Sequence, residues 1–266
     1  MPTIAIHGAA GRMGRRLVAL TTEDSALTLA AAIERVDHEL LGQDAGIIAG
    51  ARSANVPLKD GLSQKVDVLI DFSTPPATRR AMGACVETGS AMVMGTTGLQ
   101  EQDHAAIDVA ARTIAVLQAP NMSVGVNVLF AIAGQVAAQL GDEYDIEITE
   151  AHHRFKVDAP SGTALGIAES ICQATGKRMQ HDVVYDRHGP DVPRRSGQIG
   201  MHALRLGDLA GRHTVSFGAL GEELQFTHIA STRDVFARGA LAAAKWLAGK
   251  PAGRYHMADV LGLAGR

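Results

Sequence analysis

The 266-residue sequence predicts an α/β fold with a doubly wound parallel sheet, followed by a second α+β domain built on a mixed sheet. Up to residue 120, short apolar runs alternate with helical patterns, which is typical of parallel strands that helices cover on both faces. After residue 176, three β-rich runs follow one another without intervening helices, which favours a mixed or antiparallel sheet. Two further helical patterns, at 234–249 and about 256–263, close the chain.

The expected strands of the first part are near-continuous apolar runs, as strands buried on both faces require. They lie at residues 3–8, 27–33, 66–73, 91–98 and 114–120, and the helical patterns between them lie at 12–20, 75–88 and 101–112. Connections between successive parallel strands are expected to be right-handed.

The second part begins with a long apolar helix within residues 121–140, followed by a strand at 144–152, a helix at 161–176 and β-rich runs at 198–207, 213–220 and 223–231. The segment 186–197 is dense in Gly, Pro and charged residues, so we expect a mobile loop there. No helix follows the second sheet until residue 234. We therefore expect its apolar face to pair with other subunits of a homotetramer, through Ile199, Met201, Val215 and Phe217.

Composition favours a globular protein, because 46% of the residues are apolar and 20% are charged. The formal net charge of -3 provides no basic field, so neither nucleic acid nor an anionic membrane is expected as a partner. The start of the chain has no signal-peptide pattern, and no uninterrupted apolar run reaches about 18 residues. Cys85 and Cys172 are isolated within helical patterns and give neither a disulfide framework nor a zinc spacing. A cytoplasmic location is therefore expected, with both cysteines in the core.

A glycine-rich turn follows the first strand, with Gly8, Gly11 and Gly14 spaced so that backbone N–H groups face a pyrophosphate. The spacing is one residue longer than the usual Rossmann fingerprint, and a plain strand-to-helix turn is the alternative. Glu34 ends the second strand twenty residues after Gly14, where an acid binds the adenosine ribose hydroxyls. Arg35 follows, and its guanidinium is suited to a 2′-phosphate. The sequence therefore predicts a Rossmann-type site for NADH or NADPH, against the alternative of a solvated charge pair.

Two further strand ends carry small polar residues, Asp-Phe-Ser-Thr at 71–74 and Gly-Thr-Thr-Gly at 95–98. In a doubly wound sheet, ligands lie beyond the carboxyl ends of the strands. Glycine and threonine at these ends would let a nicotinamide ring approach the backbone. Generic loops use the same residue types.

Four basic side chains, His152, His153, Arg154 and Lys156, gather within five positions of the stretch EAHHRFKVDAPSGTA. If the strand continued, side chains at 152, 154 and 156 would share one face. Histidine exchanges a proton near neutral pH, and a lysine with a tuned pKa serves as an acid. Alternatives are a core histidine, a surface ion pair for Arg154, and a zinc site, although no further Cys or His has the spacing for zinc.

The same stretch contains a predicted helix start, with Ser161 as N-cap. The first-turn N–H groups of Gly162 and Thr163, with the Thr163 hydroxyl, are expected to form a carboxylate site. Together with the basic side chains, this helix start predicts binding of a small dianion that must also be protonated.

The chain resembles the dihydrodipicolinate reductases of the diaminopimelate route to lysine, essentially from end to end. The motifs that carry the resemblance are GAAGRMGR (8–15), AAIER (31–35), DFSTP (71–75), GTTG (95–98), APNMSVGVN (119–127) and, most specifically, EAHHRFKVDAPSGTA (150–164).

The resemblance implies a dinucleotide-binding domain of residues 1–121, completed by 234–266, and a substrate-binding and oligomerisation domain of residues 122–233. It implies proton transfer by His152 and Lys156, and substrate carboxylates held by His153, Gly162 and Thr163. It places the cofactor at Gly8, Ala9, Ala10, Gly11, Arg12, Met13, Glu34, Arg35, Gly95, Thr96, Thr97, Ala119, Pro120, Asn121 and Met122. Two positions depart from the family pattern, which often has glycine in place of Ala10 and glutamate in place of Arg212.

The activity that this resemblance implies is NADH- or NADPH-dependent reduction of 4-hydroxy-tetrahydrodipicolinate to tetrahydrodipicolinate, without a metal. Hydride would come from the reduced nicotinamide, and the proton from the side of His152 and Lys156. One alternative is another two-domain dehydrogenase, such as an aspartate or semialdehyde dehydrogenase. The semialdehyde type needs an activated cysteine, and neither cysteine has a histidine nearby in sequence. A non-catalytic nicotinamide-sensing protein is the other alternative.

Overall fold

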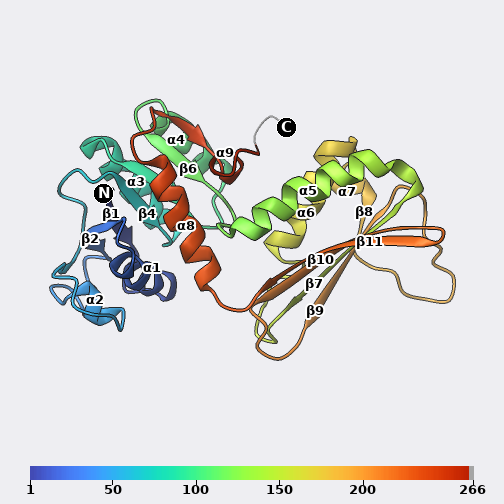
Figure 1. The fold of residues 1–266 in the computed structure, drawn as a ribbon, viewed down its shortest axis with the longest axis horizontal. Coiled ribbons are helices and arrows are strands. Elements are labelled where there is room, and N and C mark those ends of the chain that lie inside the picture. Colours follow the sequence, from blue (N-terminus) through green and yellow to red (C-terminus); the bar gives the residue numbers. More distant parts are fainter. Residues whose placement is uncertain (264–266) are drawn as a thin grey trace. The chain divides into compact units, whose positions relative to one another are not determined.

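The computed structural model describes residues 1–263 and divides into two compact units, each built on its own sheet (Figure 1). Unit 1 comprises Met1–Val124 together with the described part of the segment that begins at Asp234. Unit 2 comprises Gly125–Arg233.

Unit 1 contains a parallel seven-stranded sheet in the order β12-β6-β5-β4-β1-β2-β3. The chain runs outward from β1 to β2 and β3, then returns to the other side of β1 to form β4, β5 and β6. The switch in direction therefore lies at β1 and β4, where a doubly wound sheet binds its ligand. The strands are β1 (Thr3–His7), β2 (Thr28–Ile33), β3 (Leu58–Lys59), β4 (Val68–Asp71), β5 (Ala91–Met94), β6 (Ala115–Gln118) and β12 (Gly253–Tyr255).

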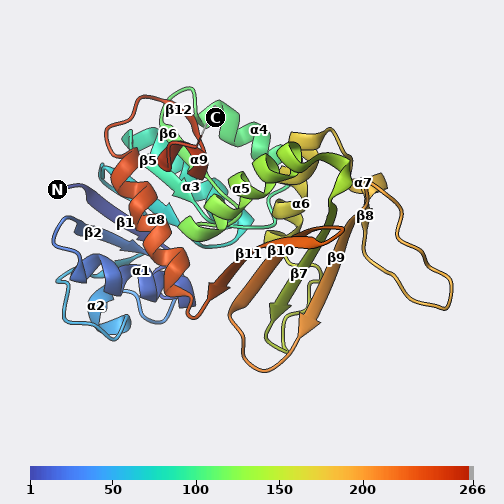
Figure 2. The same cartoon turned by 45° about the vertical axis from the view of Figure 1, so that its right-hand side comes forward.

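Helices cover both faces of this sheet, and α1 and α8 lie on the same face (Figure 2). Ile4 and Ile6 of β1 enter the core beneath α1 and α8, whereas Ala5 enters the core beneath α3 and α4. Successive side chains of a strand alternate between faces, so one strand supplies both cores. The helices are α1 (Arg12–Glu23), α2 (Ala45–Ile48), α3 (Pro75–Thr88), α4 (Glu101–Ala110), α8 (Asp234–Leu247) and α9 (Met257–Val260).

Unit 2 contains a mixed five-stranded sheet in the order β11-β10-β7-β9-β8. Strand β10 is antiparallel to β7 and β11, while β9 is parallel to β7 and β8. Its strands are β7 (Asp145–His152), β8 (Val183–Val184), β9 (Ile199–Arg205), β10 (Gly211–Ala219) and β11 (Glu222–Ala230). Its helices are α5 (Val124–Leu140), η1 (Gly141–Glu143), α6 (Gly162–Thr175) and α7 (Met179–Asp182). A doubly wound parallel sheet with a second, mixed-sheet part confirms the predicted fold class.

The apolar face of the mixed sheet is covered within the chain, so our argument that it pairs with other subunits is wrong. Ile199, Met201, Val215 and Phe217 are at most 1% exposed, because they pack against α5 and α6 in the core of unit 2. The covering helices precede these strands in the sequence, so the absence of a helix between the strands and residue 234 does not leave the face open.

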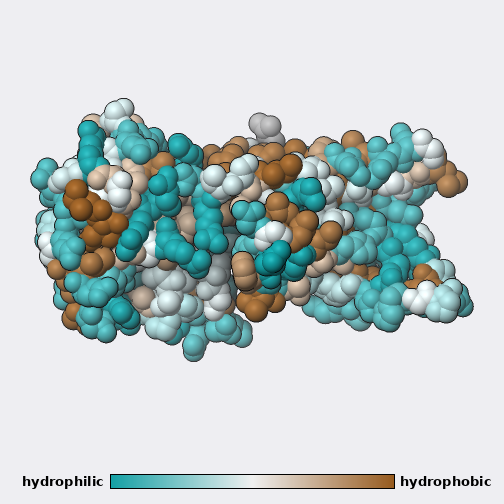
Figure 3. All heavy atoms as spheres, turned by 90° about the horizontal axis from the view of Figure 1, so that it is seen from below, coloured by the Kyte–Doolittle hydropathy of each residue, from teal (hydrophilic) through white to brown (hydrophobic). Residues whose placement is uncertain are grey.

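Helix α5 and the turn after it, Val124–Glu143, are long and apolar enough to cross a membrane by length and composition alone. Only 28% of the most apolar window of this stretch is buried. A core helix passes the same test, so the finding is weak as an indication of a membrane span. On the face shown in Figure 3, apolar patches interrupt a largely hydrophilic surface in both units.

Candidate active site and cofactor pocket

The glycine turn connects β1 to α1 in unit 1, as the sequence predicts. Gly8 has φ +73°, and a Cβ on Gly14 would lie 2.0 Å from the Gly8 carbonyl oxygen, so only glycine lets α1 start this close to the turn. The N–H groups of Gly8 and Ala9 both donate to the Ile33 carbonyl, at 2.9 and 3.0 Å. The turn is thereby tied to the end of β2.

The N–H groups that remain for an anion belong to the first turn of α1. The Ala10 N–H donates to Glu34 Oε2 at 3.2 Å, and the Gly11 N–H donates to the Gly8 carbonyl at 3.0 Å. A helix leaves its first N–H groups without intrahelical partners, and here these include those of Arg12 and Met13. Of the predicted segment 8–13, the helical end is therefore the part best suited to a phosphate.

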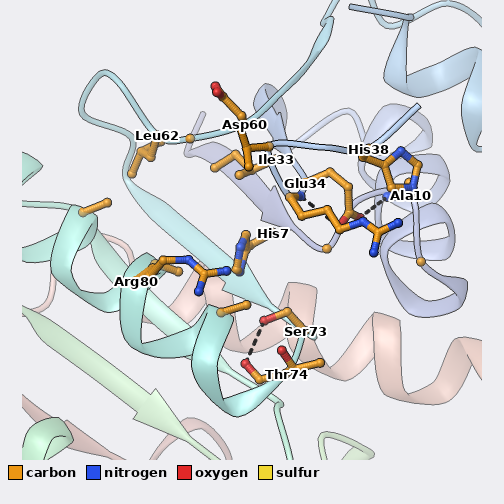
Figure 4. Close-up of a pocket in the computed structure, with 18 of the residues that line it drawn as sticks. His7, Ala10, Ile33, Glu34, His38, Asp60, Leu62, Ser73, Thr74 and Arg80 are labelled. Atoms are coloured by element: carbon orange, nitrogen blue, oxygen red, sulfur yellow. Dashed lines mark hydrogen bonds between the residues drawn. The ribbon is translucent and has the colours of Figure 1, made fainter. Parts of the chain in front are cut away.

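A cavity of about 1190 Å³ opens beside this turn, within unit 1 (Figure 4). Glu34 Oε1 also accepts from the Arg35 N–H at 3.1 Å, which keeps the carboxylate at the mouth of the turn. Arg35 is exposed, with its Nε 3.3 Å from Asp37 Oδ1. Arg80 of α3 lines the same cavity and points toward His7 in the view of Figure 4. The predicted cofactor residues that line the cavity are Gly8, Ala10, Gly11, Glu34 and Arg35.

Ala9, Arg12 and Met13 belong to the glycine turn and the start of α1 but do not line this cavity. The remaining predicted cofactor residues lie around the ends of β5 and β6 and do not line it either. A Cβ on Gly95 would lie 2.5 Å from the Phe72 ring, so glycine permits the close approach there. Ala119 and Met122 are buried, and the Met122 carbonyl packs directly on α8, where a Cβ on Gly239 would lie 1.7 Å from it. Thr97 and Pro120 are exposed, and Asn121 accepts from the Ser123 N–H through Oδ1 at 2.8 Å.

Asp71 is a buried carboxylate that joins the loops at the centre of the sheet, and our sequence reasoning gave it no role. Its Oδ1 lies 2.6 Å from His7 Nδ1 and accepts from Ser73 Oγ at 2.6 Å. Its Oδ2 accepts from Thr78 Oγ1 at 2.5 Å and from Thr96 Oγ1 at 2.8 Å. Burial alone would raise the pKa of Asp71, but the hydrogen bond and charge of His7, with bonds from Ser73 and Thr78, hold it below its ordinary value.

In unit 2, His152 ends β7 and is held by a second buried carboxylate. His152 Nδ1 lies 2.6 Å from Glu150 Oε2. Arg205 of β9 grips Glu150 through Nη1 and Nη2, each at 2.8 Å. The pKa of His152 is lowered, chiefly by burial and also by the charges of Lys156 and Arg205, although Glu150 acts to raise it. Burial alone would raise the pKa of Glu150, but Arg205 and His152 hold it below its ordinary value.

The predicted helix start is confirmed, because Ser161 Oγ accepts from the Ala164 N–H at 3.2 Å as N-cap of α6. Gly162 and Thr163 form its first turn and are not buried. Ser161 Oγ also lies 2.9 Å from Nε2 of His213, a histidine whose pKa falls to about 3 through burial and the nearby charge of His152. His213 therefore stays neutral at physiological pH.

The other basic residues lie in a turn rather than on a continued strand, because β7 ends at His152. The Lys156 N–H donates to the His153 carbonyl at 3.1 Å, and Lys156 Nζ donates to both carboxylate oxygens of Asp158 at 2.7 Å. His153 Nδ1 is buried without a hydrogen-bond partner among residues 1–263, whereas the Arg154 side chain is exposed. The structure thus links His152 to the start of α6 through Glu150, places His153 and Lys156 in the turn between them, and leaves Arg154 at the surface.

Sequence reasoning missed Glu150, Arg205 and His213 as parts of this site. Glu150 lies two residues before His152, so strand alternation alone places both on one face and was a usable signal. Arg205 and His213 reach the site through strand pairing, which no local pattern reveals. Within the described part of the chain, no group of three or more His, Cys, Asp or Glu side chains is arranged to hold a metal ion.

The fold, the residues around the glycine turn of unit 1 and the basic residues of unit 2 define a two-domain oxidoreductase with a Rossmann-type unit. The N-terminal family model of dihydrodipicolinate reductase matches residues 2–122, and the C-terminal model matches residues 125–261. The chain belongs to the dihydrodipicolinate reductase family, as its motifs predict.

Curated relatives named 4-hydroxy-tetrahydrodipicolinate reductase match almost the whole chain. That of Geobacter metallireducens is 45% identical over 266 residues, covering 99% of this chain and 100% of the relative. That of Alkalilimnicola ehrlichii is 47% identical over 263 residues, covering 98% of each.

Solved structures share the fold at lower identity. Dipicolinate-bound dihydrodipicolinate reductase from Paenisporosarcina sp. TG-14 is 23% identical, with a TM-score of 0.73 over 96% of this chain and 97% of that one. Aspartate dehydrogenase from Thermotoga maritima is 13% identical, with a TM-score of 0.51 over 94% of this chain and 98% of that one.

Proposed function

We propose that this chain reduces 4-hydroxy-tetrahydrodipicolinate to tetrahydrodipicolinate with NADH or NADPH, in lysine and diaminopimelate biosynthesis. Loss of water from the substrate gives the unsaturated ring, and addition of a hydride and a proton gives the product. The observation that carries the proposal is the pairing of a Glu150-bound His152 with a basic turn and a capped helix start in unit 2. The full-length relatives named 4-hydroxy-tetrahydrodipicolinate reductase support it.

The cofactor residues fit a dinucleotide. The cavity beside the glycine turn has room for an adenosine, Arg12 and Met13 present helix N–H groups for a phosphate, and Glu34 offers a carboxylate for ribose hydroxyls. When bound, the reduced nicotinamide would supply the hydride. The ends of β5 and β6, at Gly95–Thr97 and Ala119–Met122, would hold the nicotinamide half.

The substrate residues divide the remaining tasks. The Gly162 and Thr163 N–H groups, the Thr163 hydroxyl and the His153 ring would hold the carboxylates of the ring. His152 and Lys156 would deliver the proton, with Nε2 as the reacting atom of His152 because Nδ1 is bound to Glu150. Residues 1–121, completed by 234–266, would form the cofactor domain, and residues 122–233 the substrate and assembly domain of a cytoplasmic homotetramer.

The cysteines argue against aldehyde chemistry by a covalent thioester. Burial raises the pKa of Cys85 to about 12, and it also raises the pKa of Cys172. A nucleophilic cysteine needs a lowered pKa, so neither is activated. A nicotinamide-sensing protein has no use for the His152 and Lys156 arrangement.

Loss of NADH or NADPH absorbance with freshly generated dicarboxylate tests the proposal. We expect consumption of both cofactors that depends on the dicarboxylate. Folded protein that binds the cofactor but never oxidises it with this substrate would support the sensing alternative instead.

A further inference from the structure

We propose that Glu150 is a positioning residue that fixes the orientation of His152 and the start of α6 together. One buried carboxylate then links the proton-transfer ring to the helix start that receives the substrate carboxylate. This inference rests on the function proposed above and assigns a task to a residue that touches neither substrate nor cofactor.

The His152 ring is held at Nδ1 and has room at Nε2. Its Nδ1 lies 2.6 Å from Glu150 Oε2, and its Nε2 lies against β10, where a Cβ on Gly211 would come within 3.1 Å. With Nδ1 occupied, Nε2 is the ring atom left to exchange a proton. Glycine at 211 leaves this atom room.

The second oxygen of Glu150 reaches the helix start. Glu150 Oε1 accepts from the Ser161 N–H at 3.0 Å, and Ser161 in turn caps α6. The turn that carries His153 and Lys156 leaves β7 just after His152 and rejoins the fold at Ser161. Glu150 therefore fastens this turn at both ends.

Arg205 keeps Glu150 charged and in place. Glu150 is 0% exposed, and a buried carboxylate is costly unless it is paired and hydrogen-bonded. Arg205 supplies a bidentate pair, and its Nη2 also donates to the Asp158 carbonyl at 2.6 Å. The arginine thus fixes the carboxylate and the turn that bears Lys156.

The negative charge of Glu150 favours protonation of His152, an effect that a neutral side chain of the same shape would not have. Three charged groups act on His152: Glu150 on β7, Lys156 on the turn and Arg205 on β9. The neutral His213 on β10 also faces it, and His213 stands opposite His228 of β11 in the sheet. Glu150 is the anion among them and favours the imidazolium. A glutamine of the same shape would remove that charge, and its amide would donate to Nδ1, which disfavours a protonated ring.

The test is the pH dependence of turnover in the full-length enzyme with saturating NADPH. For Glu150→Gln we expect turnover at the wild-type optimum to fall about 100-fold, the size of an acid-catalysis effect. The alkaline limb of the profile should move to lower pH, because His152 loses its proton more readily. The dissociation constant of NADPH should stay within twofold. The proposal is overturned if turnover falls but the alkaline limb of its pH profile stays in place, or if turnover does not change.

Two comparisons make the result specific. Glu147→Gln is the matched control, since Glu147 lies on the same strand and bonds Arg187, Arg194 and His202 instead of His152. Its pH profile should keep the wild-type limbs. In a His152→Ala background, Glu150→Gln should lower turnover by less than about threefold more, because its effect acts through the ring. A full additional loss overturns the link to His152.

Failure to fold and failure of the proposed function are each recognisable. If Glu150→Gln does not fold, Arg205→Lys keeps a positive charge but breaks the fork, and turnover should fall about tenfold with unmoved limbs. Unchanged turnover in Arg205→Lys counts against the proposal. If the wild-type enzyme does not oxidise NADPH with the dicarboxylate, the proposed function has failed, whatever the variants do.

Discussion

At the scale of single residues, the basic side chains of 152–156 differ in their partners and hence in their expected roles. His152 is buried and bound to Glu150, whereas Lys156 keeps a side chain 19% exposed and paired with Asp158. Arg154 is exposed. A proton donor must meet the substrate, and the exposed part of the Lys156 side chain meets that need.

Lys156→Ala should lower turnover by about 100-fold or more, because it removes a donor of the transferred proton. NADPH binding should be unaffected, since Lys156 lies in unit 2 and the candidate cofactor residues lie in unit 1. Arg154→Ala removes a charge from the same turn and serves as control, with turnover expected within threefold of wild type. Steady-state kinetics check both. Near-normal turnover of folded Lys156→Ala would reduce the basic cluster to an electrostatic funnel.

Cofactor choice is a second question at this scale. Glu34 and Arg35 lie together at the cavity, so we expect NADH and NADPH to be used within roughly tenfold, about 1.4 kcal/mol. Arg35→Ala should weaken NADPH far more than NADH, because only NADPH has the 2′-phosphate. Arg80→Ala is the comparison, since Arg80 lines the same cavity from α3. If Arg80→Ala weakened NADPH selectively and Arg35→Ala did not, the 2′-phosphate would be assigned to Arg80 instead of Arg35.

At the scale of elements, the sequence predicted those strands, turns and helix caps that depend on residues adjacent in the chain. Strand β1, the turn at Gly8 and the cap at Ser161 each follow from residues adjacent in the chain. The short strands β3, β8 and β12 were missed, because two or three residues carry no periodicity and depend on sheet pairing. The cover over Val215 and Phe217 was misjudged for the same reason, as α5 and α6 reach it only through tertiary packing.

The residues of the candidate site likewise fall into those in local motifs and those brought in by tertiary structure. The sequence singled out His152, Lys156 and Glu34 because their motifs are local. It missed Arg205, whose distance from Glu150 of 55 residues is bridged by the pairing of β7 with β9. Asp71 lies in the motif DFSTP, yet its bonding partners come from β1, α3 and the loop after β5. Buried carboxylates gather partners from several elements, and a linear pattern shows only one of them.

Asp71 therefore makes a prediction about how elements are held together. Asp71→Asn should destabilise unit 1 by roughly 2–3 kcal/mol at neutral pH, the size of a lost hydrogen bond to a charged group. The folded pKa lies below the ordinary value of 3.8, so this contribution is present above that value and disappears as pH falls through the folded pKa. The difference between wild type and variant should shrink accordingly in acid.

Urea unfolding followed by the fluorescence of Trp246, the single tryptophan, reports on unit 1 because it lies in α8. Asp60→Asn changes an exposed carboxyl at the same cavity and should shift stability by less than about 0.5 kcal/mol. A stability difference for Asp71→Asn that stays constant from neutral to acid pH would contradict the role of its charge.

At the scale of the whole molecule, assembly must use a surface other than the covered face of the mixed sheet. Ile229, Arg212, Ala151 and Leu204 pair across four strands in one row, on the face opposite to Ile148 and Val215. Ile229 is 64% exposed and Leu204 is 41% exposed. Strand β11 is also a nine-residue edge, and proteins seldom leave such an edge uncovered.

We therefore predict a homotetramer that buries this open face and edge. Ile229→Lys should dissociate it, because a lysine ammonium resists burial against an apolar partner. Ile47→Lys is the matched control, since Ile47 is a 62% exposed isoleucine in α2 of unit 1, and it should leave the assembly intact. Light scattering at micromolar concentration checks all three proteins. A wild-type monomer would refute the tetramer. A tetramer that survives Ile229→Lys but not Ile47→Lys would place the contact on unit 1, and the open face of the mixed sheet would then need another explanation.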